Sequence, residues 1–235
     1  MSQAKAFLVV FFASFLLSAC GQKEEKVSQT STPEPENSAP AKKAFPVQEL
    51  LALYDSVAAF PLKASTSIGD NDPESEAFLF RGREIPRHLS IIFDSLIYSQ
   101  EDRPHRDEKM EHTQVFATKM FQISPTSVAL LTRVPGFYWS SKLMLFHFNV
   151  TTNRPTHAYE LADTWGDAGN SYLRESVITK TQNNTYQIKI TSGECNPIDG
   201  PLSKRHCVDS LLKGTITNQA IAFNKRLKVK DTIEK

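Results

Sequence analysis

Two groups of residues have types and spacings that could bind a metal ion. His105, Glu108 and His112 would share one helical face at i, i+3 and i+7, although Pro104 and the surrounding charges are equally typical of a solvated loop. The segment 163–170, DTWGDAGN, has two acids and two glycines but lacks the alternating Asp and Asn oxygens and the distant Glu of an EF-hand calcium loop. We therefore predict a loop and a hairpin turn, with no metal and no cofactor.

A second set of candidates could bind a ligand. His147 lies in the apolar run LMLFHF, on the face of Leu143 and Leu145, where a single histidine is usually a hydrogen-bonded structural residue. In a closed barrel it could instead line a cavity. Aromatic residues near predicted strand ends could form a ligand platform, although rim packing explains them as well. The speculative ligand-binding residues are His147, Tyr138, Trp139 and Trp165.

The motifs of several common enzyme classes are missing from the sequence. There is no Gly-x-Ser-x-Gly elbow, phosphate loop, His-Glu-x-x-His or dinucleotide fingerprint. These absences favour a protein without catalytic activity, but an enzyme whose residues converge only in the fold stays open.

The elements that must position these residues are mostly strands. From residue 114 onward, short β-type runs alternate with turn signals at 152–155, 166–170 and Asn183-Asn184. No helix-length segment separates the runs, which favours an antiparallel meander, either barrel-like or a sandwiched sheet. The expected strands lie near 114–123, 127–134, 138–150, 157–164, 171–181, 185–192 and 207–224.

Before these strands, the sequence predicts one helix. Pro46 suits a helix start, and apolar residues recur at helical spacing between residues 47 and 58, so we expect a short amphipathic helix that covers one side or end of the sheet. In the apolar stretch 78–98, the segment AFLFRGREIP suits a strand, whereas RHLSIIFDSLIY fits either strand or helix. The fold class expected is mainly β (α+β).

The first twenty residues have the organisation of a secretory signal. Lys5 is the only charged residue, and the apolar run 7–17 would span about 17 Å as a helix, too short for a hydrocarbon core of about 30 Å. The run ends in Leu17-Ser18-Ala19-Cys20, which resembles the lipobox of bacterial lipoproteins. The resemblance implies a signal peptide at 1–19, palmitate-type acylation of Cys20 and a membrane as partner. An ordinary signal peptide with a chance cysteine is the alternative.

The residues after the implied cleavage site bear on location. Gly21 is not the aspartate that resembles an inner-membrane retention signal, so we expect the outer membrane. The next four residues are similar to the lysine-plus-acids signal by which one group of Gram-negative bacteria sends lipoproteins to the cell surface. They are Gln22, Lys23, Glu24 and Glu25. A solvated charge cluster is the alternative, so a surface-exposed and a periplasm-facing orientation both stay open.

Acylation of Cys20 would leave two cysteines in an exported chain. Cys195 and Cys207 can pair in an oxidising compartment, and the loop they close would stabilise the fold by about 3 kcal/mol. A metal pair with His206 is the rival interpretation. Neighbours on a strand point to opposite faces, so His206 and Cys207 would chelate poorly. We predict a disulfide.

Composition divides the chain further. Residues 20–43 contain the lipid anchor and a segment with no aromatic residue and only one large aliphatic, Val27, which predicts a disordered tether reaching up to roughly 60 Å. Residues 44–226 are expected to form a single β-rich domain, and 227–235 a polar tail.

Charge and motifs together lead to three functional hypotheses. The chain has 27 basic and 26 acidic residues, so nothing in its charge favours nucleic acid as a partner. The leading hypothesis is a non-catalytic binding or structural module of the outer membrane that contacts a protein, a glycan or a small ligand. The alternatives are a hydrolase of envelope or extracellular polymer and a lipocalin-like carrier of a small ligand.

Overall fold

The computed structural model describes residues 45–66, 80–97, 114–135, 141–182, 185–198, 200 and 204–234, all within one compact unit, 43–235. Several sequence predictions fall outside these residues. They concern the signal peptide, Cys20, residues 22–25, the tether, the turn at Asn183-Asn184, the candidate metal ligands His105, Glu108 and His112, and the aromatic residues Tyr138 and Trp139.

The described residues form short helices followed by long strands. The helices are α1 (Val47–Leu51), α2 (Arg87–Ser90), the 3-10 helix η1 (Ile91–Phe93) and α3 (Asp94–Ile97). The early strands are β1 (Asp55–Ser56), β2 (Leu62–Ala64) and β3 (Arg83–Glu84). The later strands are β4 (Phe116–Ser124), β5 (Ser127–Pro135), β6 (Ser141–Asn149), β7 (Arg154–Asp167), β8 (Asn170–Lys180), β9 (Tyr186–Pro197), β10 (Arg205–Ile216), β11 (Ile221–Phe223) and β12 (Leu227–Glu234).

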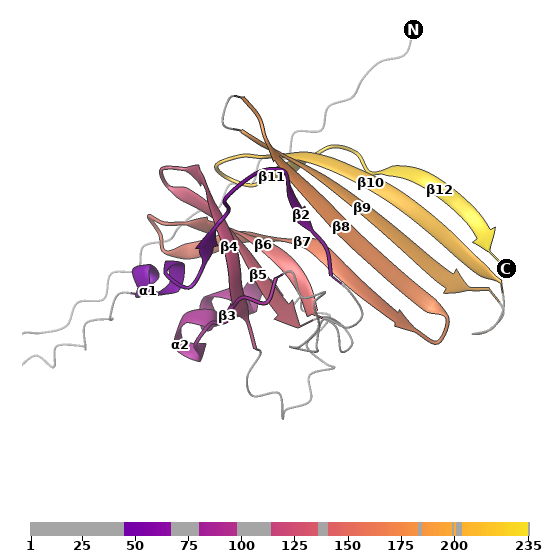
Figure 1. Ribbon diagram of the computed structural model, residues 1–235, viewed down its shortest axis with the longest axis horizontal. Helices are drawn as coiled ribbons and strands as arrows, with labels where there is room; N and C mark the ends of the chain where they lie inside the picture. Colours follow the sequence, from indigo (N-terminus) through magenta and orange to yellow (C-terminus); the bar gives the residue numbers. More distant parts are fainter. Residues whose placement is uncertain are drawn as a thin grey trace, which may run out of the picture. The chain divides into compact units, whose positions relative to one another are not determined.

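The strands build one sheet, which confirms the predicted mainly β fold. From β4 to β11 each strand pairs antiparallel with the next one in the chain, as a meander requires (Figure 1). The short strands attach to this meander: β3 and the parallel β1 to β4, and β2 to β8. The sheet is not closed.

A change of partner along β7 divides the sheet into two layers. Residues 154–162 of β7 pair with β6, whereas 163–167 pair with β8. Further along β8, β2 takes the place of β7. The two layers therefore pack on each other, with Phe121 of β4 and Tyr186 of β9 in contact at 4.6 Å between ring centroids. Of the two arrangements expected, the structure has the layered one.

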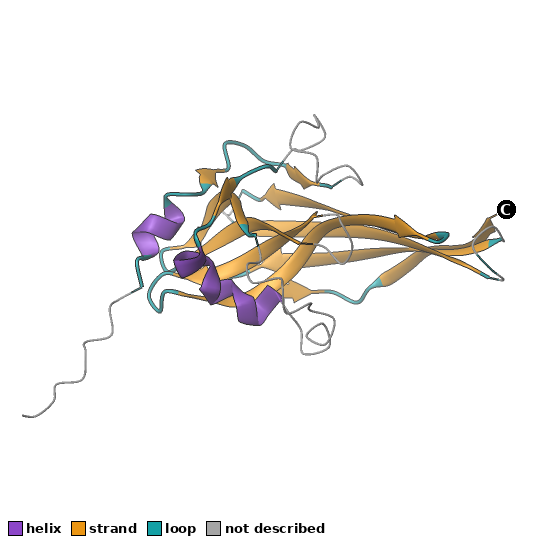
Figure 2. Ribbon diagram, turned by 90° about the horizontal axis from the view of Figure 1, so that it is seen from below, coloured by secondary structure: helices purple, strands orange, loops and turns teal. Residues whose placement is uncertain are grey.

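A second core lies on the other side of β4–β6. The helices cover this face, as Figure 2 shows, and Phe93 of η1 packs on Phe146 of β6 with ring centroids 4.7 Å apart. The central strands are thus buried on both faces, which explains their near-continuous apolar runs. None of the helices described is long and apolar enough to cross a membrane.

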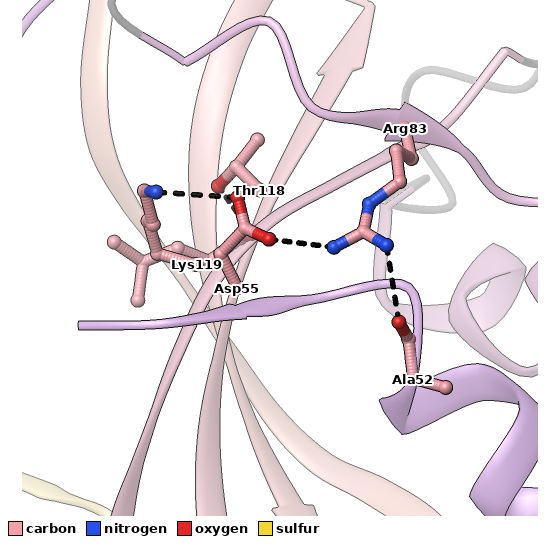
Figure 3. Close-up of polar contacts among 6 residues, drawn as sticks. Ala52, Asp55, Arg83, Thr118 and Lys119 are labelled. Carbon is pink, nitrogen blue, oxygen red and sulfur yellow. Dashed lines mark hydrogen bonds and ion pairs between the residues drawn. The ribbon is translucent and has the colours of Figure 1, made fainter. Parts of the chain in front are cut away.

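The first helix is shorter than predicted. It ends at Leu51, because Asp55 and Ser56 pair with β4 as the short strand β1. The Tyr54 hydroxyl shares a 2.7 Å hydrogen bond with Thr132. Asp55 pairs with Arg83 at 2.6 Å and with Lys119 at 3.3 Å, which joins β1, β3 and β4 (Figure 3). These exposed ion pairs add little stability, and the register of this edge follows from the pairing of β1 and β3 with β4.

Two further predictions near the C-terminus were wrong. The expected single strand 207–224 is two strands, β10 and β11, separated by a turn in which Thr217 receives the backbone N–H groups of Gln219 and Ala220 on its hydroxyl. The expected polar tail is the strand β12, which pairs with residues 205–211 of β10.

Candidate functional site

The apolar side chains between the two layers form what we call the interlayer core. Beyond it, the same face of the sheet carries mainly polar side chains. Residues opposite one another in antiparallel strands point to the same side, and so do residues two apart along a strand. The strand registers therefore define two parallel rows that cross β7, β8, β9, β10 and β12. The first row is Asp163, Arg174, Ser192, Ser210 and Lys228, and the second is Trp165, Tyr172, Glu194, Val208 and Asp231. We call these ten residues the polar face.

The boundary between core and polar face is sharp. The row before the first one consists of Ser176, Ile190 and Leu212, of which Ser176 and Ile190 are buried. Two residues further along each strand, polar side chains begin. A shallow groove of about 290 Å³ lies there, lined by Tyr172, Ser192, Glu194, Val208, Ser210, Arg226 and Lys228.

Arg174 organises one end of the polar face. Its guanidinium donates to Glu160 Oε1 at 3.0 Å, and the Tyr172 hydroxyl donates to the same oxygen at 3.2 Å. The Tyr172 ring stacks on Trp165 with centroids 5.8 Å apart and an interplanar angle of 24°. Burial, followed by the charge of Glu160, raises the pKa of Tyr172 to about 12, so the phenol stays protonated as a donor.

Asp163 is the most unusual group of the polar face. The residue is 5% exposed, yet Oδ1 has no hydrogen-bond partner among the described residues, and neither has the buried Nε of its cross-strand neighbour Arg174. Burial and then the charge of Glu160 raise the pKa of Asp163 to about 6. Each of these atoms could form a hydrogen bond to a ligand group or to water. Alternatively, the carboxyl could deliver a proton.

His147 was predicted either as a structural residue or as a cavity-lining one, and the structure shows it as structural. It is buried, and Nε2 donates to the Thr217 carbonyl at 2.9 Å while Nδ1 lies 3.3 Å from the Thr156 hydroxyl. Burial lowers its pKa, so the ring is neutral at pH 7. Its role is to hold the turn before β11 against β6.

The predicted disulfide is confirmed. Cys195 and Cys207 are bonded and occupy opposite positions of β9 and β10, with Cα atoms 4.0 Å apart. His206 instead contacts Asp231 of β12, as expected for a neighbour that points to the opposite face. The turn predicted at 166–170 is also present, with Ala168 and Gly169 at positive φ between the paired Asp167 and Asn170.

Of the predicted ligand-binding residues, the structure thus brings Trp165 to the polar face and excludes His147 from it. Sequence reasoning missed Glu160, Arg174 and the serines of the first row. Two signals were present in the sequence. The alternation along β8 puts Tyr172 and Arg174 on one face, and the turn at 166–170 determines which residues of β7 lie opposite them.

Comparisons of the chain with models of protein families, with curated proteins and with solved structures found no match.

Proposed function

We propose that the chain is a lipoprotein of the cell envelope, anchored to the outer membrane through Cys20, whose polar face binds a glycan without cleaving it. The observation that supports this most is the polar face, in which hydrogen-bonding side chains share one side of the sheet with the Trp165–Tyr172 stack. The lipobox-like Leu17-Ser18-Ala19-Cys20 supports the anchor.

The chemistry of the rows suits a hydroxyl-rich ligand. Sugar hydroxyls donate and accept hydrogen bonds, and the rows offer both functions through Ser192 and Ser210, whose hydroxyls are 2.8 Å apart, and through Glu194. Stacked aromatic rings suit the apolar face of a sugar ring. Strands lie about 4.8 Å apart, so five strands present a row of roughly 19 Å, which fits several sugar units better than one small ligand.

A hydrolase of envelope polymer is the second candidate, and one observation favours it. Asp163, with a pKa of about 6, could act as a general acid near neutral pH. A second carboxylate would have to act as base or nucleophile, and Glu160 is already engaged by Arg174 and Tyr172. Binding therefore has more support than cleavage.

The lipocalin-like carrier has less support. It needs a cavity on the face of His147, and that face is packed with side chains of both layers. His147 itself makes hydrogen bonds within the fold.

Glycan binding can be tested by co-sedimentation of the protein with insoluble peptidoglycan and by retention on immobilised neutral and acidic polysaccharides. Two variants alter the polar face: Arg174→Met, and the double change Ser192→Ala with Ser210→Ala. Glu175→Gln is the matched control, because this exposed residue points to the opposite face of β8. We expect at least one polymer to be retained, and both polar-face variants to lose about tenfold in affinity, as removal of two hydrogen bonds implies.

Equal retention of all variants, or retention of no polymer, would refute glycan binding at this face. The hydrolase is tested on the same polymers by product release: cleavage that disappears in Asp163→Asn would replace the binding proposal.

The anchor has its own test. Cys20→Ala should release the protein from the membrane fraction and abolish incorporation of labelled palmitate. Unchanged fractionation, with no label in the parent, would refute the lipoprotein assignment. Protease added to intact cells distinguishes a surface orientation, in which the tether is cut, from a periplasm-facing one, in which it is protected.

A further inference from the structure

A second candidate site lies at the other end of β8. It is an open groove of about 570 Å³ beside α1. Its residue Lys180 lies six positions after Arg174, which is about 20 Å along β8. We call it the α1 groove. Its described lining is Val47, Gln48, Leu51, Ser56, Val57, Phe60, Met120, Phe121, Gln122, Pro125, Val128, Val150, Lys180 and Tyr186.

The floor of the α1 groove is apolar and reaches both cores of the fold. Val128 belongs to the core under the helices, and Met120 packs against that core. Phe121 and Tyr186 belong to the interlayer core, and Phe60 contacts both rings, with centroids 5.5 and 5.2 Å away. A hydrocarbon chain in the groove would therefore continue the packing of two existing cores.

The polar atoms of the floor are already used within the fold. The Gln122 amide nitrogen donates to the carbonyls of Ser124 and Ser127, and the Tyr186 hydroxyl donates to the Gln122 carbonyl at 2.9 Å. Among the described lining residues, every buried side-chain nitrogen or oxygen has a hydrogen-bond partner. A hydrocarbon chain that packs on this floor has no hydrogen bonds to water to lose.

The charge of the lining is one-sided. Among the described lining residues, Lys180 is the only charged one. It is exposed, and its ammonium lies 5.9 Å from the centre of the Tyr186 ring. The groove thus presents one cation at its rim and an apolar floor beside it.

We propose that the α1 groove binds a single-chain anionic amphiphile of the fatty-acid type, with the hydrocarbon on Phe60, Met120 and Val128 and the carboxylate at Lys180. A cavity of this size is ordinary for a small-molecule site. The proposal goes beyond glycan binding and uses no residue of the polar face.

The test is calorimetric titration of the full-length chain with dodecanoate below its micelle concentration. The chain carries Cys20→Ala, so that no lipid of its own competes. We expect one site per chain and, in a series from octanoate to dodecanoate, a gain of about fourfold in affinity per methylene.

Two pairs of variants separate head from tail. Lys180→Glu replaces an attraction by a repulsion and should weaken dodecanoate binding about tenfold, whereas Lys189→Glu, an exposed lysine of β9 outside the groove, should not. Ser56→Trp places a ring in the groove from an exposed position and should abolish binding, whereas Ala58→Trp, exposed and outside the lining, should not.

Three results would overturn the proposal. The first is no binding of dodecanoate, and the second is equal effects of the two lysine variants. The third is binding by the Cys20→Ala chain but not by the lipidated parent, which would assign the groove to the protein's own acyl chain. Since peptidoglycan and polysaccharide retention depend on the polar face, failure here leaves that proposal standing, and the reverse also holds.

Discussion

Asp163→Asn tests whether the buried, ionised carboxylate of Asp163 lowers the stability of the fold. Asp163 is 5% exposed, and its Oδ1 lacks a hydrogen-bond partner among the described residues. Its pKa is raised from the ordinary 3.8 to about 6, burial being the main cause. The neighbouring Lys142 and Arg174 attract the carboxylate but do not offset burial and the charge of Glu160.

The sign follows from proton binding. Between pH 4 and 6 the folded chain holds a proton on Asp163 that the unfolded chain has lost, so stability rises as the pH falls through about 6. At pH 7.5 the carboxyl is ionised in both states and the whole penalty is present. A pKa displaced from 3.8 to about 6 corresponds to a penalty of at most about 3 kcal/mol. Asp163→Asn should raise the free energy of unfolding by up to that amount at pH 7.5 and have little effect at pH 4.

Urea unfolding of the parent and Asp163→Asn, followed by circular dichroism at pH 7.5, 6 and 4.5, measures this difference. Asp167→Asn is the control, because Asp167 is exposed near the end of the same strand and its substitution should leave the profile unchanged. A variant less stable than the parent at pH 7.5, or a difference that does not change with pH, would refute the reasoning. The first result would mean that the carboxylate stabilises the fold as an anion, and the second that its ionisation does not affect stability.

Three further predictions concern the fold. Phe146→Ala should lower the free energy of unfolding by about 3–5 kcal/mol, because it empties a fully buried position against Phe93. Ile233 is 64% exposed on β12, so Ile233→Ala should change that free energy by no more than about 0.5 kcal/mol. Urea unfolding measures both, and equal effects would contradict the core assignment. Cys195→Ser with Cys207→Ser should cost about 3 kcal/mol, measured against the oxidised parent; no change would show that the bond contributes nothing. Because burial lowers the pKa of His147 below 6.5, the folded chain binds fewer protons than the unfolded one and loses stability as the pH falls through 6.5; His147→Gln should remove this loss in unfolding profiles between pH 7 and 5, and an unchanged slope would assign it elsewhere.

Most of the strands could be predicted because their signals are local. Apolar runs and turn residues located β4 to β8 to within three residues, whereas β9 ends five residues later than predicted and the single strand expected at 207–224 is β10 and β11. The strand β12 could not be found this way, because Leu227, Val229 and Ile233 are exposed and what holds the strand is backbone pairing with β10. The early end of α1 likewise depends on Tyr54 and Asp55 contacting residues far along the chain.

Predicting the polar face requires the registers between its strands, and of the β7–β8 and β8–β9 registers only the first could be derived from the sequence. A two-residue turn at Ala168-Gly169 places Asp167 opposite Asn170, and counting back along both strands puts Asp163 opposite Arg174. The next register was not accessible. An Asn183-Asn184 turn counted in the same way would place residue 182 opposite 185, whereas the structure pairs Lys180 with Tyr186. That one-residue difference would have moved Ser192 and Glu194 to the opposite face.

The point at which β7 exchanges β6 for β8 as its partner determines where the interlayer core ends and the polar face begins. The interlayer core needs β7 beside β6, and this pairing ends at Ala162. The long strands β8, β9 and β10 continue beyond that point, so among the described residues no strand of β4–β6 lies opposite their next side chains, and these can be polar. Glu160 lies before the change and Asp163 after it, so both contribute to the environment of Arg174. Because the apolar packing ends before the polar rows begin, substitution of the half-buried Ser192 and Ser210 should change ligand binding with little effect on stability, whereas Asp163→Asn should change stability as well.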